Sequence, residues 1–279
     1  GFYLPFKQDY TVEGFSTITW KGNSTNNRYF GGVGFNPDLI WTKARNVAYS
    51  PSVYDSVRGY GSIHNLVPAT TEAENGGNQV YGGIASSSAD GFTTFVGSDG
   101  GNPYANHNED GKTYVAWNWD MGGSNASNTN GSITSTVRAN ATYGQSIVSY
   151  TGNGSDGATV GHGLSSAPDM VIIKGRAITS HWSVGHIGLG TNEVLLLSSD
   201  AAKADCTSDF GGGGVGARGA TTFTLEAGTS NANNVNTNSS AFIAYCFHSV
   251  TGYSKFGSYS GTGSSGNATT GLGFQPAFL

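Results

Sequence analysis

The segment Gly144–Arg176 reads GQSIVSYTGNGSDGATVGHGLSSAPDMVIIKGR, and related segments occur at two other places in the chain. An earlier copy spans Gly14–Arg45, and a third, partial copy runs from Tyr253 to Leu279. Each copy has an aromatic anchor, a glycine pair and a proline that precedes an apolar run. The anchors are Trp20, Tyr150 and Tyr259, which are separated by 130 residues (150 − 20) and 109 residues (259 − 150). These periods are domain-sized, so we expect each copy to have its own small core and the anchors to occupy equivalent places.

The composition favours strands over helices. Charged residues make up 11% of the chain, against about 25% in an ordinary soluble domain, and glycine contributes 44 positions. Glycine, Asn, Ser and Thr are poor residues for helix interiors, while 37% hydrophobic and 12% aromatic residues suffice for a core. Several short alternating segments separated by turn residues predict an all-β fold of tandem β-sandwich-like repeat domains with little helix.

The positions of the copies predict five regions. These are residues 1–13, the end of a preceding domain or a docking strand; 14–120, the first β repeat; 121–143, an extended connector; 144–249, the second β repeat; and 250–279, the start of a truncated third repeat. Because the chain starts at Gly1 and stops inside the third copy, we expect it to be part of a longer polypeptide.

Charge and hydropathy argue against two classes of partner. With 13 Lys and Arg against 18 Asp and Glu, the net charge is −5, so we expect no nucleic-acid partner. No apolar run approaches the roughly 18 residues that cross a bilayer, so we expect no membrane insertion. Two cysteines cannot form a dense disulfide framework, and Cys246, inside an apolar run, is expected to be a buried filler.

The residues that could carry chemistry have simpler structural interpretations. His162 stands where the other copies have Val33 and Leu272, and His181 and His186 lack further ligands at metal-binding spacing. The candidate glycosidase carboxylates are Asp38, Asp55, Asp90, Asp169, Asp205, Asp209 and Glu226. Asp38 and Asp169 each follow a proline, where bonds to nearby backbone amides are expected. The run Gly211–Gly216 is expected to be an open loop because no Lys-Ser/Thr pair follows it.

We therefore expect no catalytic residues, no metal ligands and no cofactor. Exposed aromatic rings beside Asn and Ser could stack on sugars, but the tryptophans fall at strand positions where core packing is equally suitable. They are Trp20, Trp41, Trp117, Trp119 and Trp182. The sequence leaves any glycan-binding residues unassigned.

Several motifs together resemble a known family. They are Tyr150–Gly154, Thr159–Leu164, Pro168–Lys174, Tyr245–His248 and Gly252–Tyr259, together with the junction formed by Tyr114–Trp119 and Asn128–Ser135. In this order they resemble the repeats of large virion structural proteins, often described as tail-fibre proteins, of marine and freshwater tailed bacteriophages. The resemblance covers nearly the whole chain and implies a virion component without catalytic residues. Ala277 departs from the pattern, because the other copies have Asp38 and Asp169 there.

The expected function is that of a non-enzymatic tail-fibre stalk segment that positions a host-recognition tip. We expect a homotrimer that contacts other virion proteins, since lateral association covers strand edges. The protein would be assembled in the host cytoplasm and act in the extracellular virion. The alternatives are a host-attachment adhesin module that binds a surface polysaccharide, and a decoration or fibre protein of the phage head.

Overall fold

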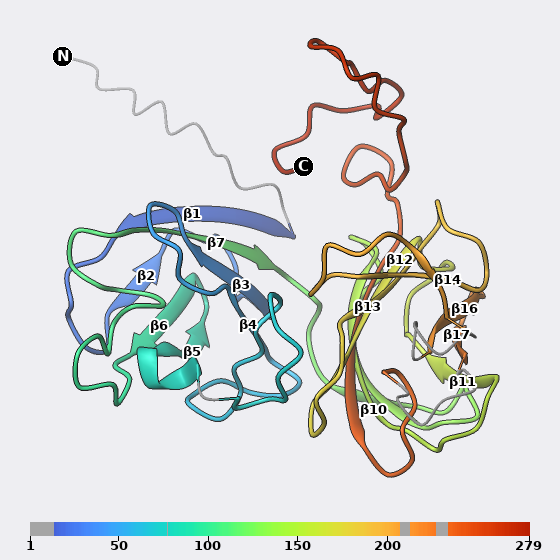
Figure 1. The fold of residues 1–279 in the computed structure, drawn as a ribbon, viewed down its shortest axis with the longest axis horizontal. Helices are drawn as coiled ribbons and strands as arrows, with labels where there is room; N and C mark the ends of the chain where they lie inside the picture. The colour runs from blue at the N-terminus through green and yellow to red at the C-terminus, as the bar shows by residue number, and fades with distance from the viewer. Residues whose placement is uncertain (1–13, 77, 207–212, 227–233) are drawn as a thin grey trace.

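The fold is all-β, as predicted. The computed structural model describes residues 14–76, 78–206, 213–226 and 234–279, so the expected docking strand in residues 1–13 lies outside the described residues. Within the described part there are eighteen strands and one short 3-10 helix, η1 (Asn78–Tyr81). The strands form four sheets, and the paired strands in them are antiparallel (Figure 1). No helix in these ranges is long and apolar enough to cross a membrane.

The first unit, shown in blue to green in Figure 1, consists of two facing sheets. The larger sheet has the order β1-β7-β3-β4 and the smaller one β2-β6-β5. The strands are β1 (Phe15–Lys21), β2 (Tyr29–Gly31), β3 (Leu39–Ala44), β4 (Ser52–Asp55), β5 (Gly83–Ser88), β6 (Gly91–Phe95) and β7 (Thr113–Trp119). Aromatic and β-branched residues alternate along β1 and β7, which suits a pleated sheet with one buried face.

The second unit repeats this arrangement with a wider sheet. Its central strands follow the order β13-β12-β18-β10, which corresponds to β4-β3-β7-β1, and β11-β17-β16 covers one face. The strands are β10 (Gln145–Thr151), β11 (Ala158–Gly161), β12 (Met170–Gly175), β13 (Ser183–His186), β16 (Gly214–Arg218), β17 (Thr222–Glu226) and β18 (Ala241–Phe247). Its edges are extended by β8 (Ala126–Asn128) and β9 (Ser135–Asn140) on one side, and by β14 (Glu193–Leu196) and β15 (Ala204–Asp205) on the other.

The connector and the edge strands extend the large sheet of the second unit. Residues 121–143 were expected to be extended, and β9 pairs along β10 from Gln145 to Tyr150. At the other edge Ala204 and Asp205 form β15. This short strand is held by tertiary contacts, since Val194 pairs with Ala204 and packs on Cys206.

The first two aromatic anchors occupy matching environments in the two cores. Trp20 stacks on Tyr114 with ring centroids 5.6 Å apart, and Tyr150 stacks on Phe242 at 5.3 Å. The indole N–H of Trp20 donates to the carbonyl of His107 at 2.8 Å, and the hydroxyl of Tyr150 donates to the carbonyl of Val235 at 2.7 Å. The two copies therefore build the same core around their anchors.

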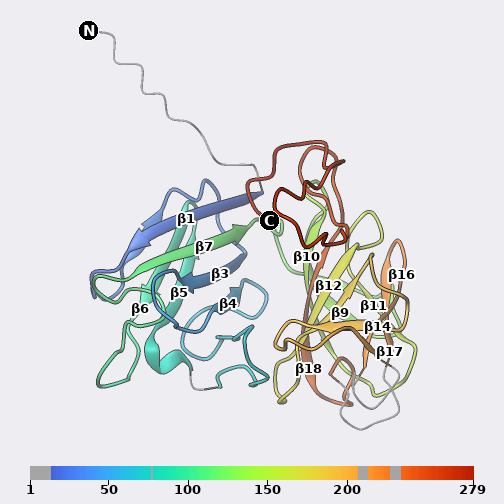
Figure 2. The ribbon, with the colours of Figure 1, turned by 45° about the horizontal axis from the view of Figure 1, so that its top comes forward.

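The third anchor behaves differently. Tyr259 is 75% exposed, whereas Trp20 and Tyr150 are 9% and 3% exposed. Residues 255–279 contain no strand, and they leave the second unit as a looped segment, red in Figures 1 and 2. The expectation of equivalent surroundings thus holds for two anchors and is wrong for Tyr259.

Candidate functional site

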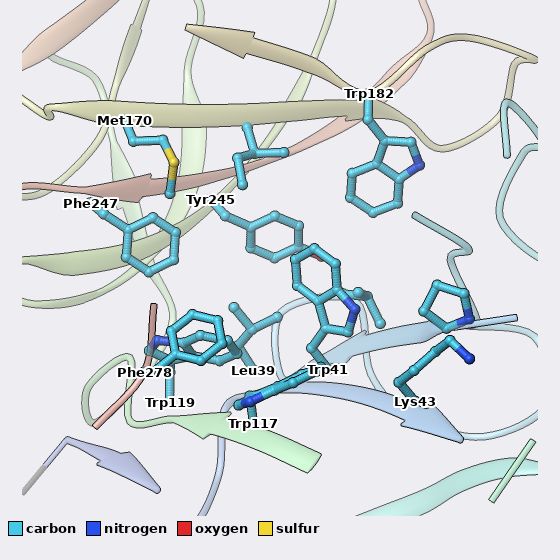
Figure 3. Close-up of a pocket in the computed structure, with 13 residues that line it drawn as sticks. Leu39, Trp41, Lys43, Trp117, Trp119, Met170, Trp182, Tyr245, Phe247 and Phe278 are labelled. Carbon is cyan, nitrogen blue, oxygen red and sulfur yellow. The ribbon is translucent and has the colours of Figure 1, made fainter. Parts of the chain in front are cut away.

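An apolar groove of about 320 Å³ lies where the two units meet (Figure 3). We call it the aromatic groove. The first unit contributes Leu39, Trp41, Lys43, Pro51, Val53, Trp117 and Trp119 to its lining. The second unit contributes Met170, Ile172, Trp182, Tyr245 and Phe247, and the C-terminal segment contributes Phe278.

The strand periodicity places these side chains in the groove. Trp117 and Trp119 alternate along β7 with the buried Ala116 and Asn118, so one face of the strand turns to the first core and the other to the groove. Tyr245 and Phe247 occupy the corresponding positions of β18. Equivalent faces of the two large sheets therefore meet at the groove, and Figure 3 shows their rings directed toward one another.

The polar atoms beside the groove are engaged in structural bonds. The indole N–H of Trp182 donates to the carbonyl of Val67 at 3.1 Å, and the hydroxyl of Tyr245 donates to Asp55 at 2.7 Å. The ammonium of Lys43 bonds the carbonyl of Ala44 at 2.9 Å. The groove thus offers aromatic and aliphatic surface, which suits apolar protein side chains better than a hydroxyl-rich sugar.

A loop of the first unit, residues 56–76, lies against the second unit and fixes one side of the groove. We call it the clamp loop. Arg58 in this loop pairs with Asp55 at 2.5 Å and with Glu74 at 3.0 Å, and its guanidinium is fully buried. Glu74 also pairs with Arg176 of the second unit at 2.7 Å. The backbone carbonyl of Thr71 accepts a further bond from the N–H of Ser180 at 2.9 Å.

The electrostatics of the clamp loop favour the ionised form of the Glu74 carboxyl. Burial opposes ionisation of Glu74, but Arg58 and Arg176 outweigh burial and hold the pKa of this carboxyl below its usual value. Burial raises the pKa of the Tyr245 hydroxyl, which stays protonated and donates to Asp55. Removal of one partner would leave a buried charge without compensation.

Comparison with known proteins places the chain in one family. Residues 11–279 match the family described as "Domain of unknown function (DUF7483)". The chain belongs to this family. No curated protein and no solved structure matches it significantly.

In this DUF7483 chain the proline-linked carboxylates have the same role in both units. Asp38 accepts the backbone N–H of Met121 at 2.9 Å, and Asp169 accepts that of Ser249 at 2.7 Å. Both amides follow the closing strand of their unit, about 80 residues away, so the sequence-based expectation of nearby amides was wrong about the partner. Asp38 also pairs with Arg138 at 2.9 Å, while burial raises its pKa.

The other candidate carboxylates are dispersed over the two units. Asp90 accepts the N–H groups of Gly32 and Gly34 at 3.0 and 2.7 Å. Asp205 lies in β15, and Glu226 ends β17 with a pKa raised by burial. Asp209 and the first part of Gly211–Gly216 lie outside the described residues, and Gly214–Gly216 belong to β16.

The histidines hold loops. His162 is buried, its Nδ1 accepts the N–H of Leu164 at 3.1 Å, and its Nε2 lies 3.1 Å from the carbonyl of Gly219. His181 lies 3.1 Å from the hydroxyl of Ser198, and His186 accepts the N–H of Gly188 at 3.0 Å. In the described ranges no three His, Cys, Asp or Glu side chains gather closely enough to hold a metal ion. Cys206 and Cys246 are buried and unbridged.

Sequence reasoning missed an asparagine bridge that closes each unit beside its anchor. The side chain of Asn108 bonds the side-chain amide of Asn23 at 3.1 Å and the carbonyl of Thr25 at 2.8 Å. Asn236 bonds Asn153 and Ser155 in the same way, at 3.0 and 2.8 Å. A signal was present, since Gly22-Asn23 and Gly152-Asn153 recur in the copies. The glycines are required because a Cβ there would lie 2.0 Å and 2.4 Å from the carbonyl oxygens of Glu109 and Thr237.

Proposed function

We propose that the chain is a structural building block of a bacteriophage virion, and specifically a stalk segment of a tail fibre that positions a host-recognition tip. The observation that carries the proposal is the union of two repeat-related β units through shared apolar packing and a buried ion-pair network. A fibre needs stiff joints between successive domains, and both features resist hinge motion at this joint. The phage origin rests on the resemblance of the repeat motifs to virion structural proteins.

The shared packing supports stiffness in a specific way. One cluster of buried side chains includes Leu39 and Val53 of the first unit together with Ile172, Trp182 and Phe247 of the second. Small and polar contacts between domains allow relative motion, whereas a large apolar interface restrains it. The clamp loop adds charges that would be costly to separate.

A role without catalysis agrees with the structural hydrogen bonds and ion pairs that the polar side chains form. Asp38, Asp55, Asp90 and Asp169 each bond backbone amides or a buried guanidinium that hold strands and loops in place. These bonds explain the presence of the carboxylates without a reaction. A glycan-binding role finds less support at the aromatic groove, because the lining Tyr245 hydroxyl and Trp182 indole N–H are already bonded within the protein.

Immunogold electron microscopy tests the proposal. Antibodies raised against residues 14–249 are applied to tailed particles purified from lysates that contain the protein, with particles lacking it as the control. Gold is expected along fibres of the particle tail. Gold on the head would assign the protein to a decoration role, and detection of the protein in soluble lysate with unlabelled particles would overturn the virion assignment.

A sugar array with the purified chain tests the adhesin alternative separately. Binding to a defined polysaccharide, abolished by substitutions at an exposed aromatic residue, would replace the stalk role with host attachment.

A further inference from the structure

Three equivalent positions of the repeat converge on the aromatic groove. Leu39, Met170 and Phe278 each lie two residues after the proline of their copy, at Pro37, Pro168 and Pro276. All three line the groove, although they are far apart in the sequence (Figure 3). Phe278 contacts Phe15 and Trp117 with ring centroids 5.6 Å apart in both pairs. The third copy thus reaches the groove with the same residue position as the first two.

The third copy also shares the backbone conformation of the first copy at its glycine turn. Gly271 and Gly273 adopt φ values of +83° and +82°, and the corresponding Gly32 and Gly34 adopt +86° and +88°. This left-handed conformation is strained for other residues. The turn that leads into the third strand of a unit is therefore already formed in residues 271–273.

The strand order explains why the rest of the third copy does not pair. In the first unit β7 lies between β1 and β3, so β1 and β3 share no ladder. Residues 253–279 correspond to β1, the glycine turn and the first residues of β3, and they contain no counterpart of β7. The segment around Tyr259 consequently has no adjacent strand in the described structure, and the Tyr259 ring remains 75% exposed.

We propose that the aromatic groove is the docking site of a third β unit of this same repeat type, whose first strand and glycine turn are residues 253–273. The rest of that unit consists of strands equivalent to β3 through β7. Its large sheet enters the groove from Phe278 with the same apolar face that the first two units present there. Three equivalent sheet faces then enclose one apolar centre.

The surface left open at the groove matches such an occupant. Trp41, Trp117 and Trp119 are half-buried, and Phe278 is 49% exposed. Burial of this aromatic surface against a second apolar face is favourable because it removes the rings from water. A sheet face with aromatic residues at positions equivalent to Trp117 and Tyr245 would supply rings for this contact.

Two extended chains test the inference. In one, residues 41–120 are repeated directly after Leu279, and in the other residues 172–249 are repeated there, so that each graft continues the repeat in register. In at least one of the two extended chains, amide exchange of residues 254–260 is expected to slow by about 100-fold or more relative to chain 1–279. Hydroxyl-radical oxidation of Trp117 and Trp119 is expected to fall several-fold.

A variant and a matched control separate docking from folding. In the extended chain, Met170→Arg is expected to leave residues 254–260 protected but to restore the oxidation of Trp117 and Trp119, since it places a charge in the groove. Leu195→Arg, at a 38% exposed position on β14, is expected to change neither readout.

Three results would overturn the inference. They are the absence of protection at 254–260 in both extended chains, protection without reduced oxidation of Trp117 and Trp119, and concentration-dependent protection of these tryptophans in chain 1–279, which would make a second copy the occupant. The inference does not depend on a virion location, so none of these results bears on the proposed function.

Discussion

The two β units share one internal arrangement but differ at their edges. Both have an aromatic anchor, an asparagine bridge and a carboxylate that binds the amide after the closing strand. The sheet of the first unit ends at β1 and β4, whereas that of the second is widened by β8 and β9 on one side and β14 and β15 on the other. The connector from the first unit thus covers an edge of the second. The two units thus differ in the number of strands at the sheet edges, while the bonds of the anchor, the asparagine bridge and the carboxylate are the same in both.

The largest expected effect comes from the anchors. Trp20→Ala and Tyr150→Ala each remove a buried ring, and each is expected to lower the free energy of unfolding by about 4–5 kcal/mol. Tyr259→Ala is expected to change it by less than about 0.5 kcal/mol because the ring is exposed. Urea denaturation followed by circular dichroism measures all three. Equal losses at the three anchors would contradict the difference between the third copy and the first two.

The clamp loop occurs in the first unit, so we expect loss of its buried ion pairs to cost more stability than loss of an ion pair in the second unit. Arg58→Met leaves the buried Asp55 without its cationic partner, and the free energy of unfolding is expected to fall by about 3–4 kcal/mol. Lys203→Met removes an exposed ion pair with Glu193 in the second unit, and no measurable loss of stability is expected because solvent screens this pair. Denaturant titration of both variants measures the two losses. Comparable losses would contradict a larger contribution of the buried network to stability.

The asparagine bridges should prove equivalent. Asn108→Ala and Asn236→Ala each remove several partly buried hydrogen bonds, and each is expected to cost about 1–3 kcal/mol. Hydrogen exchange measured separately for residues 15–21 and 145–151 reports which unit loosens. A loss of stability in only one of the two variants would mean that the asparagine bridges contribute unequally to the stability of the two units.

A pH titration distinguishes the first unit from the second. Burial lowers the pKa of His107 to about 3 from 6.5, and the corresponding position in the second unit is Val235. Between these two pH values the unfolded chain binds more protons, so stability is expected to fall as the pH falls from 6.5 toward 3, by at most about 1.4 kcal/mol per pH unit from this residue. Thermal unfolding of the protein and of His107→Asn across this range measures the contribution, and identical slopes would contradict it.

The sequence predicted the fold class and the equivalence of the first two anchors, because strand periodicity and glycine placement are local signals. It did not predict the asparagine bridges or the partners of Asp38 and Asp169, because those bonds join residues about 80 positions apart. The aromatic groove was also missed. Trp41, Trp117 and Trp119 suited a core as well as a contact surface, and only the relative placement of the two units separates these roles.

The central position of β7 and β18 also has a consequence during protein synthesis. Each is the last strand of its unit to leave the ribosome, yet each must insert between strands made much earlier. At roughly 5–20 residues per second, β1 waits about 5–20 s for its neighbour β7, with apolar side chains and backbone groups unprotected. Nascent chains of this protein are therefore expected to need chaperone protection during translation, until residues 113–119 have emerged.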